Sequence, residues 1–172
     1  IMNITDVDDK TIKRSIKEKQ SFLELTEKYT QSFFEDVKKL NIKPATKYPL
    51  ATEMIDPMID MVKKITTELV AKQRQLLILG GEHSITLGTY TSFPKETGYV
   101  VFDAHYDLRD EYADIKLSHA SYLRRIVEER GPENILHVGA RAFVKEELEF
   151  LKENNIKTIS DKEVREGKAE MQ

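Results

Sequence analysis

The chain has 172 residues, of which 40% are hydrophobic and 33% charged, and its formal net charge is −3 at pH 7. This length can bury one core or two small ones, the composition excludes wholesale disorder, and the charge gives no reason to expect nucleic acid as a partner. No apolar run approaches the length of a membrane span, so no membrane contact is expected. The absence of cysteine excludes disulfides, thiolate zinc sites and a thiol nucleophile, and it favours a cytoplasmic protein.

Acidic residues end the first polar stretch, which spans residues 3–10 and reads NITDVDDK. Asp8 or Asp9 is expected to cap a helix that starts at about Lys10, because a carboxylate oxygen accepts the free backbone N–H groups of a first helical turn. The acids at positions 6, 8 and 9 offer a weak metal site as an alternative. Helix capping by a solvated acidic turn is the preferred interpretation.

A longer helix is predicted from Phe22 to Leu40, with Ser21 as its cap and Glu24 three residues further on. Its apolar residues recur at spacings of three and four, and they are interpreted as core rather than as a ligand surface. These residues are Phe22, Leu25, Tyr29, Phe33, Val37 and Leu40.

Three features of this segment, NITDVDDK, the helix after Ser21 and the sequence ATEMI at 51–55, together resemble the cysteinyl-tRNA synthetase family. The resemblance covers residues 1–64 and implies part of a catalytic domain that follows its first nucleotide-binding half. The HIGH and KMSKS motifs that bind ATP in that family are missing here, as is its cysteine-rich zinc site. Aminoacylation is therefore not predicted for a segment without the phosphate clamp.

One helix is predicted to lead out of this segment, because Asp56 and Pro57 match an N-cap followed by proline at the first helical position. Its apolar spacing continues in helical register to about Gln73. We therefore expect a domain boundary at 64/65, inside a helix and without a flexible linker. The junction matches no natural family, which favours a chimeric or recombined chain.

Apolar runs and amphipathic stretches alternate over residues 65–172, the pattern of a parallel sheet with helices on both faces. The predicted strands are Leu76–Leu79, Tyr99–Phe102, Ile135–Val138 and Lys157–Ile159. The predicted helices run from Ser84 to about Thr91, from His119 to near Gly131, and from about Lys145 to Glu153. The fold class is therefore α/β, a partial parallel sheet of about four strands with flanking helices, preceded by an α-helical segment.

Candidate metal ligands follow the first two predicted strands. Asp103, His105 and Asp107 alternate at period two, so an extended backbone points all three side chains the same way. His83 comes just after a glycine pair that permits close backbone approach. Imidazole and carboxylate suit a borderline divalent ion, whereas aligned carboxylates without a cation would repel one another. His137, alone on the third strand, is interpreted as a core histidine.

Three short motifs in this half of the chain resemble the arginase–agmatinase (ureohydrolase) family in order and spacing. They are GGEHS at 80–84, DAHYD at 103–107 and SHAS at 118–121. The resemblance implies an arginase-like sheet and a dimanganese centre whose hydroxide attacks a guanidinium carbon and releases urea. It also implies a small guanidino substrate such as agmatine, and a place in polyamine biosynthesis.

The same resemblance assigns roles to five residues. His83 and Asp107 would hold one manganese ion, His105 would hold the other, and Asp103 would bridge the two. His119 would lie beside the substrate and could carry protons. The family also has an Asp-x-Asp pair on a later strand and a further acidic residue that reads the guanidinium, and neither is found in this sequence. We therefore expect a truncated domain with one bound ion or none, and little or no turnover.

Three hypotheses for function follow from the sequence. The first is a truncated, metal-dependent ureohydrolase of agmatinase type behind a synthetase-like segment. The second is a non-catalytic chimeric folding unit, and the third is a cysteinyl-tRNA synthetase fragment. A small sheet leaves an edge exposed unless another element covers it, so a homo-oligomer or a partner at that edge is an expected interaction.

Overall fold

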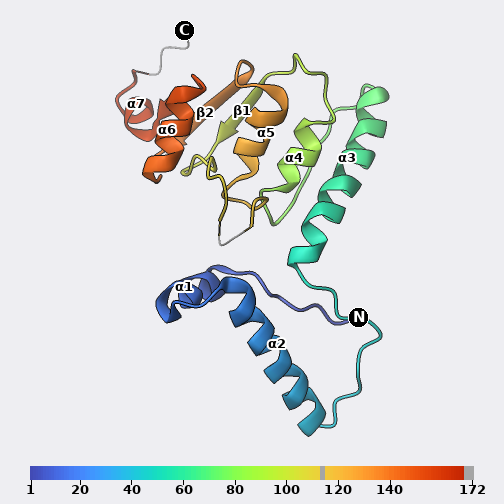
Figure 1. The fold of residues 1–172 in the computed structure, drawn as a ribbon. Helices are drawn as coiled ribbons and strands as arrows, with labels where there is room; N and C mark the ends of the chain where they lie inside the picture. The colour runs from blue at the N-terminus through green and yellow to red at the C-terminus, as the bar shows by residue number, and fades with distance from the viewer. Residues whose placement is uncertain (113–114, 169–172) are drawn as a thin grey trace. The chain divides into compact units, whose positions relative to one another are not determined.

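The computed structural model describes residues 1–112 and 115–168 of the chain, drawn as a ribbon in Figure 1. Contacts divide the chain into two compact units, Ile1–Pro57 and Met58–Gln172. None of the helices within the described residues combines the length and the apolar character that a membrane span requires.

The first helix of the amino-terminal unit, α1, spans Asp9–Glu18 and begins as predicted, with Asp8 as its cap. The Thr11 backbone N–H donates to Asp8 Oδ1 at 2.6 Å. This bond lowers the pKa of Asp8 below its ordinary value, because it stabilises the ionised carboxylate. Asp8 is therefore a helix cap in this unit.

The second helix, α2, spans Phe22–Lys39, but its apolar stripe is less buried than predicted. Phe22, Leu25 and Val37 are buried, whereas the other three residues of the stripe are exposed: Tyr29, Phe33 and Leu40. Within the unit, α2 packs against the short α1, which covers a part of that stripe. Ser21 occupies the N-cap position as predicted, although its side chain makes no capping hydrogen bond within the described residues.

The amino-terminal strand-like segment is tied to the end of the unit by backbone and side-chain bonds. Ile4 forms an isolated parallel bridge with Leu50. The buried Asp6 accepts hydrogen bonds from the backbone N–H of Thr52, at 3.0 Å, and from its hydroxyl. These bonds fix the 3₁₀ turn Thr52–Met54, so Asp6 has a structural role.

Helix α3 spans Ile55–Ala71 and therefore contains both residues 64 and 65, which confirms the predicted continuous helix. Ile59 and Thr66 lie on its buried side. In the carboxyl-terminal unit, α3 comes close to the next helix, α4, at Gly88, where a Cβ atom would lie 2.4 Å from the Ile59 carbonyl oxygen. Glycine at this position lets the two helix backbones approach.

The carboxyl-terminal unit is an α/β domain, as predicted, with three parallel strands in the order β1-β2-β3 among the described residues. The strands are β1 (Tyr99–Phe102), β2 (Ile135–Ala140) and β3 (Lys157–Ser160). The helices after α3 are α4 (Ile85–Tyr90), α5 (Tyr122–Arg130), α6 (Lys145–Glu153) and α7 (Asp161–Arg165). Strand, loop and helix alternate along the chain (Figure 1), the arrangement that brings polar loops to the carboxyl ends of neighbouring strands.

The core of this unit lies between α5 and one face of the sheet. It contains Tyr90, Val101, Tyr106, Leu108, Tyr122, Leu123, Ile126, Val127, Ile135, Ala140 and Ile156. The opposite face of β1 is open, since Val100 and Phe102 are 51% and 79% exposed. The loop after β1 thus leaves a strand that is packed on one side only.

Two local predictions for this unit were wrong. The predicted strand Leu76–Leu79 is not formed: Leu77 and Leu79 are 86% exposed, and the segment has no strand partner within the described residues. An apolar run becomes a strand only where a neighbour accepts its backbone hydrogen bonds. His119 lies in a turn, because α5 begins three residues later, at Tyr122.

We predict that Gly88→Ala destabilises the fold by about 1–3 kcal/mol, because the new methyl group would overlap the Ile59 carbonyl and force α3 and α4 apart. Urea unfolding measures the change. Gly98→Ala is the matched control, because no atom of the described chain beyond the two neighbouring residues lies within 4 Å of the added carbon. Equal destabilisation by both substitutions would contradict the close packing of these helices.

Candidate metal centre

The candidate ligands come from two loops of the carboxyl-terminal unit. Asp103 directly follows β1, and the loop continues through His105 and Asp107 to the fully buried Leu108. His83 lies in the turn before α4. The end of β1 and this turn therefore bring residues about twenty positions apart in the sequence to one place.

His83, Asp103 and Asp107 converge on one point, with a ligand atom from each lying within 4.8 Å of the others. His83 Nδ1 is 3.3 Å from Asp103 Oδ2 and 3.3 Å from Asp107 Oδ2. One imidazole and two carboxylates around a common centre form a donor set for a divalent cation. The structure thus brings together three of the four predicted ligands.

His105, the fourth predicted ligand, lies beside this group and not within it. Its side chain is 64% exposed, and its Nδ1 lies 3.4 Å from Asp103 Oδ1. The His105 backbone N–H donates to the same oxygen at 2.9 Å. Asp103 therefore faces His83 with one carboxylate oxygen and His105 with the other.

The charges in the group shift two pKa values in opposite directions. The Asp107 carboxylate, as a hydrogen-bond partner, raises the pKa of His83 above its ordinary value, although partial burial acts against it. Burial acts to raise the pKa of Asp103, but the His105 backbone N–H and the His83 ring outweigh it, so this pKa is lowered. In the metal-free protein, protonation of His83 would therefore offset the repulsion between the carboxylates.

An aromatic wall closes one side of the cluster. The ring centroid of Tyr122 lies 4.2 Å from that of His83, and the Tyr122 hydroxyl is 3.3 Å from the Tyr99 hydroxyl. Burial raises the pKa of both tyrosines, so they remain neutral hydrogen-bonding groups. The contact between Tyr122 and His83 was not predicted from the sequence.

His119 lies near Glu82, the residue that precedes the candidate ligand His83. Its Nδ1 lies 3.8 Å from Glu82 Oε1, and its side chain is half exposed. Glu82 was not predicted as a site residue, although it directly precedes His83 in the GGEHS motif. Its other oxygen accepts from the backbone N–H of Ser84 at 2.8 Å.

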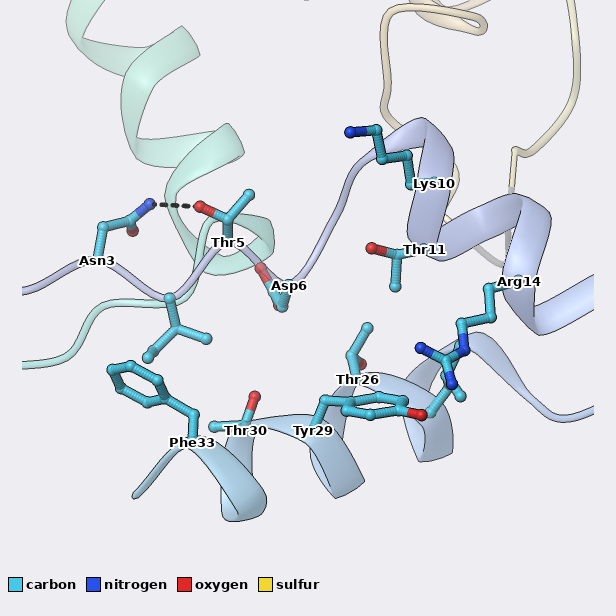
Figure 2. A pocket seen from close by; sticks show the side chains of 12 residues that line it. Asn3, Thr5, Asp6, Lys10, Thr11, Arg14, Thr26, Tyr29, Thr30 and Phe33 are labelled. Carbon is cyan, nitrogen blue, oxygen red and sulfur yellow. Dashed lines mark hydrogen bonds between the residues drawn. The ribbon is translucent and has the colours of Figure 1, made fainter. Parts of the chain in front are cut away.

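Two cavities lie near the residues that the sequence analysis singled out. One, of about 310 Å³, is lined by Glu82 and His83 together with Ile78, Gly80, Gly81, Ile85 and Thr86. The other, of about 410 Å³, lies in the amino-terminal unit between the first residues, α1 and α2 (Figure 2). Lys10 and Arg14 line the second cavity, and its carboxylate, Asp6, is engaged by Thr52. The first cavity is therefore the one that adjoins the metal-ligand cluster.

These features define a class of protein: an α/β domain with a cluster of candidate metal ligands, one histidine and two aspartates, at the carboxyl end of a parallel strand. The chain belongs to the arginase family, whose sequence pattern matches residues 12–172.

Individual relatives agree with this assignment. The chain is 32% identical to the agmatinase of Bacillus subtilis over 134 residues, which are 76% of this chain and 46% of that protein. Among solved structures, the agmatine ureohydrolase of Thermoplasma volcanium superposes with a TM-score of 0.63 at 31% identity, covering 70% of this chain and 40% of that one. The chain therefore spans less than half the length of these two relatives.

A part of the chain is similar to a second group of proteins. It is 45% identical to the cysteine–tRNA ligase of Protochlamydia amoebophila over 85 residues, which are 49% of this chain and 16% of the ligase. The two resemblances predicted from the sequence are thus both confirmed.

We predict that the ion pairs of His83 with Asp103 and Asp107 stabilise the metal-free protein at low pH, and that this stabilisation is lost as the pH rises. The folded pKa of His83 is raised, so its contribution is complete below the unfolded value of about 6.5 and disappears as the pH passes through the higher folded value. Urea unfolding in the presence of a chelator, with wild type compared with His83→Gln, measures it. The stability difference should shrink from about pH 5.5 to about pH 8.5. A difference that grows over this range would contradict the pairing.

Proposed function

We propose that the carboxyl-terminal unit is a manganese-dependent ureohydrolase domain that hydrolyses a small guanidino compound, with agmatine as the first candidate. The convergence of His83, Asp103 and Asp107 in a chain of the arginase family carries this proposal. Agmatinase and agmatine ureohydrolase among the relatives support the substrate class.

The donor set fits manganese, because carboxylate oxygens suit this ion and imidazole suits the divalent metals near it in the series. His83 and Asp107 would hold one ion. The two oxygens of Asp103 face His83 and His105, which supports a bridging role for Asp103 and a place for His105 at a second ion. One ion, at the three-residue cluster, is the occupancy that we propose first.

A bound divalent ion supplies Lewis acidity and lowers the pKa of the water that it holds. In the proposed reaction, a water would add to the guanidinium carbon and the bond from this carbon to the alkyl nitrogen would break, giving urea and an amine. The electron pair of the broken bond stays on the nitrogen, which takes up a proton released by the water. We propose that His119, which is half exposed and lies 3.8 Å from Glu82, would carry this proton.

The cavity beside Glu82 and His83 supports a cationic substrate, because the Glu82 carboxylate lines it and would attract a guanidinium group. Hydrolysis of agmatine would give a diamine as the second product. We therefore propose a role in cytoplasmic polyamine biosynthesis. Three converging side chains form an incomplete ligand set, so we propose that turnover by this chain alone is slow.

We predict that manganese raises the melting temperature of the protein, because a ligand that binds the folded state stabilises it by mass action, by about 2.7 kcal/mol at one hundred times Kd. Differential scanning calorimetry measures the shift. Asp103→Asn should abolish it, and His105→Ala should reduce it, because the His105 ring faces the other oxygen of Asp103. Asp60→Asn, at an exposed position in α3, is the matched control and should keep the shift. No shift in the wild type would leave the chain as a non-catalytic folding unit.

We predict slow, manganese-dependent release of urea from agmatine, measured against arginine as a second substrate. His119→Ala should lower the rate about 10²-fold, the low end of the usual effect of a lost proton carrier, without changing the metal-induced shift in melting temperature. Metal binding without urea release would overturn the hydrolase activity and retain the metal site. Cysteine-dependent ATP–pyrophosphate exchange would instead support the ligase-fragment hypothesis.

A further inference from the structure

The loop that carries the ligands, residues 103–108, has a backbone shape that needs support. Asp107 has φ of +53°, in the left-handed region that side chains other than glycine rarely adopt. Such a conformation persists only where surrounding groups hold it. Because the carboxylate of Asp107 belongs to the cluster, whatever holds this backbone also sets the direction of a ligand.

A buried carboxylate from α6 contacts the loop at this position. Glu147 is 4% exposed, and its Oε1 accepts the backbone N–H of Leu108, the residue after Asp107, at 3.1 Å. Its Oε2 accepts the backbone N–H of Val144 at 2.9 Å. One side chain thus ties the strained position of the loop to the start of α6, a helix 39 residues further along the chain.

A buried imidazole from β2 contacts the loop at a second point. His137 is 1% exposed, and its Nε2 lies 2.7 Å from the carbonyl oxygen of His105. Its Nδ1 has no hydrogen-bond partner among residues 1–112 and 115–168. An unpaired buried nitrogen costs stability, which an aliphatic side chain would avoid. The histidine is therefore explained better by the hydrogen bond that it donates than by packing.

We propose that Glu147 and His137 are positioning residues that hold the loop 103–108 in the shape that metal binding requires. Both contact loop backbone atoms next to predicted ligands, and both leave the ligand side chains free. They act through His105 and Asp107 and do not coordinate the ion. This inference rests on the proposed metal-dependent function.

Removal of groups that orient metal ligands typically lowers metal affinity by about 10- to 100-fold. We expect a loss of this order when Glu147 or His137 is replaced. A purely structural role predicts a different result. The variants would then unfold more easily, but the folded fraction would bind manganese with unchanged affinity.

The first test is Glu147→Gln, because a single amide oxygen can replace only one of the two accepting carboxylate oxygens. Titration calorimetry of the full chain with manganese gives the affinity, and urea unfolding of the metal-free protein gives the stability. We expect affinity about tenfold weaker than in the wild type. Glu149→Gln, on the exposed side of the same helix, is the control and should bind as the wild type does. Wild-type affinity in Glu147→Gln would overturn the proposal for this residue.

The second test compares two replacements of similar size at position 137. Glutamine retains an N–H that can donate to the His105 carbonyl, whereas leucine has none. We expect His137→Leu to weaken manganese binding about tenfold and His137→Gln to restore most of the loss. Equal affinities of the two variants would overturn the role of this hydrogen bond.

A measurement without metal separates failure of this inference from failure of the proposed function. If the wild type binds no manganese, amide hydrogen exchange in the metal-free protein still reports on the loop. Glu147→Gln should speed exchange of the Leu108 amide relative to Glu149→Gln, because its acceptor is weakened. Unchanged exchange at Leu108 would show that Glu147 does not hold the loop.

Discussion

Electrostatic repulsion between Asp103 and Asp107 is the constraint on which the rest of the site depends. Both carboxylates approach the same imidazole nitrogen of His83 at 3.3 Å, in a place where Asp107 is buried. Two negative charges so close together favour a cation beside them, and among the described residues the imidazole of His83, which faces both carboxylates, would supply it when protonated. A divalent ion would satisfy the same requirement with a larger charge, and it would release the proton from His83 as it binds.

The surrounding fold serves this arrangement. β1 delivers Asp103 at its carboxyl end, the buried Leu108 anchors the far end of the loop, and Tyr122 supports the His83 ring from the core. The face of β1 opposite this core remains open, so the strand that leads to Asp103 is packed on one side only. The candidate ligands therefore lie beside a packed core, while Leu77 and Leu79 of the apolar segment before His83 are exposed and that segment has no strand partner within the described chain.

The sequence predicted those features that depend on local pattern. Alternation after β1 located Asp103 and Asp107, and the GGEHS motif located His83. Features that depend on neighbours were missed: the run Leu76–Leu79 has strand composition but no strand partner within the described residues, and Glu147 was not singled out in its predicted helix. Periodicity predicts which face of a helix or strand is buried. It does not predict which distant backbone N–H will donate to a carboxylate or which ring will contact another, so the role of Glu147 and the Tyr122 contact were missed.

The central claim is that His83, Asp103 and Asp107 hold one divalent ion in common. Crystals of the protein grown with manganese, with diffraction recorded at the manganese absorption edge, test it most directly. The account predicts one strong anomalous peak about 2.0–2.6 Å from Nδ1 of the histidine and from an oxygen of each aspartate. The absence of a manganese peak at this cluster at saturating manganese would contradict it.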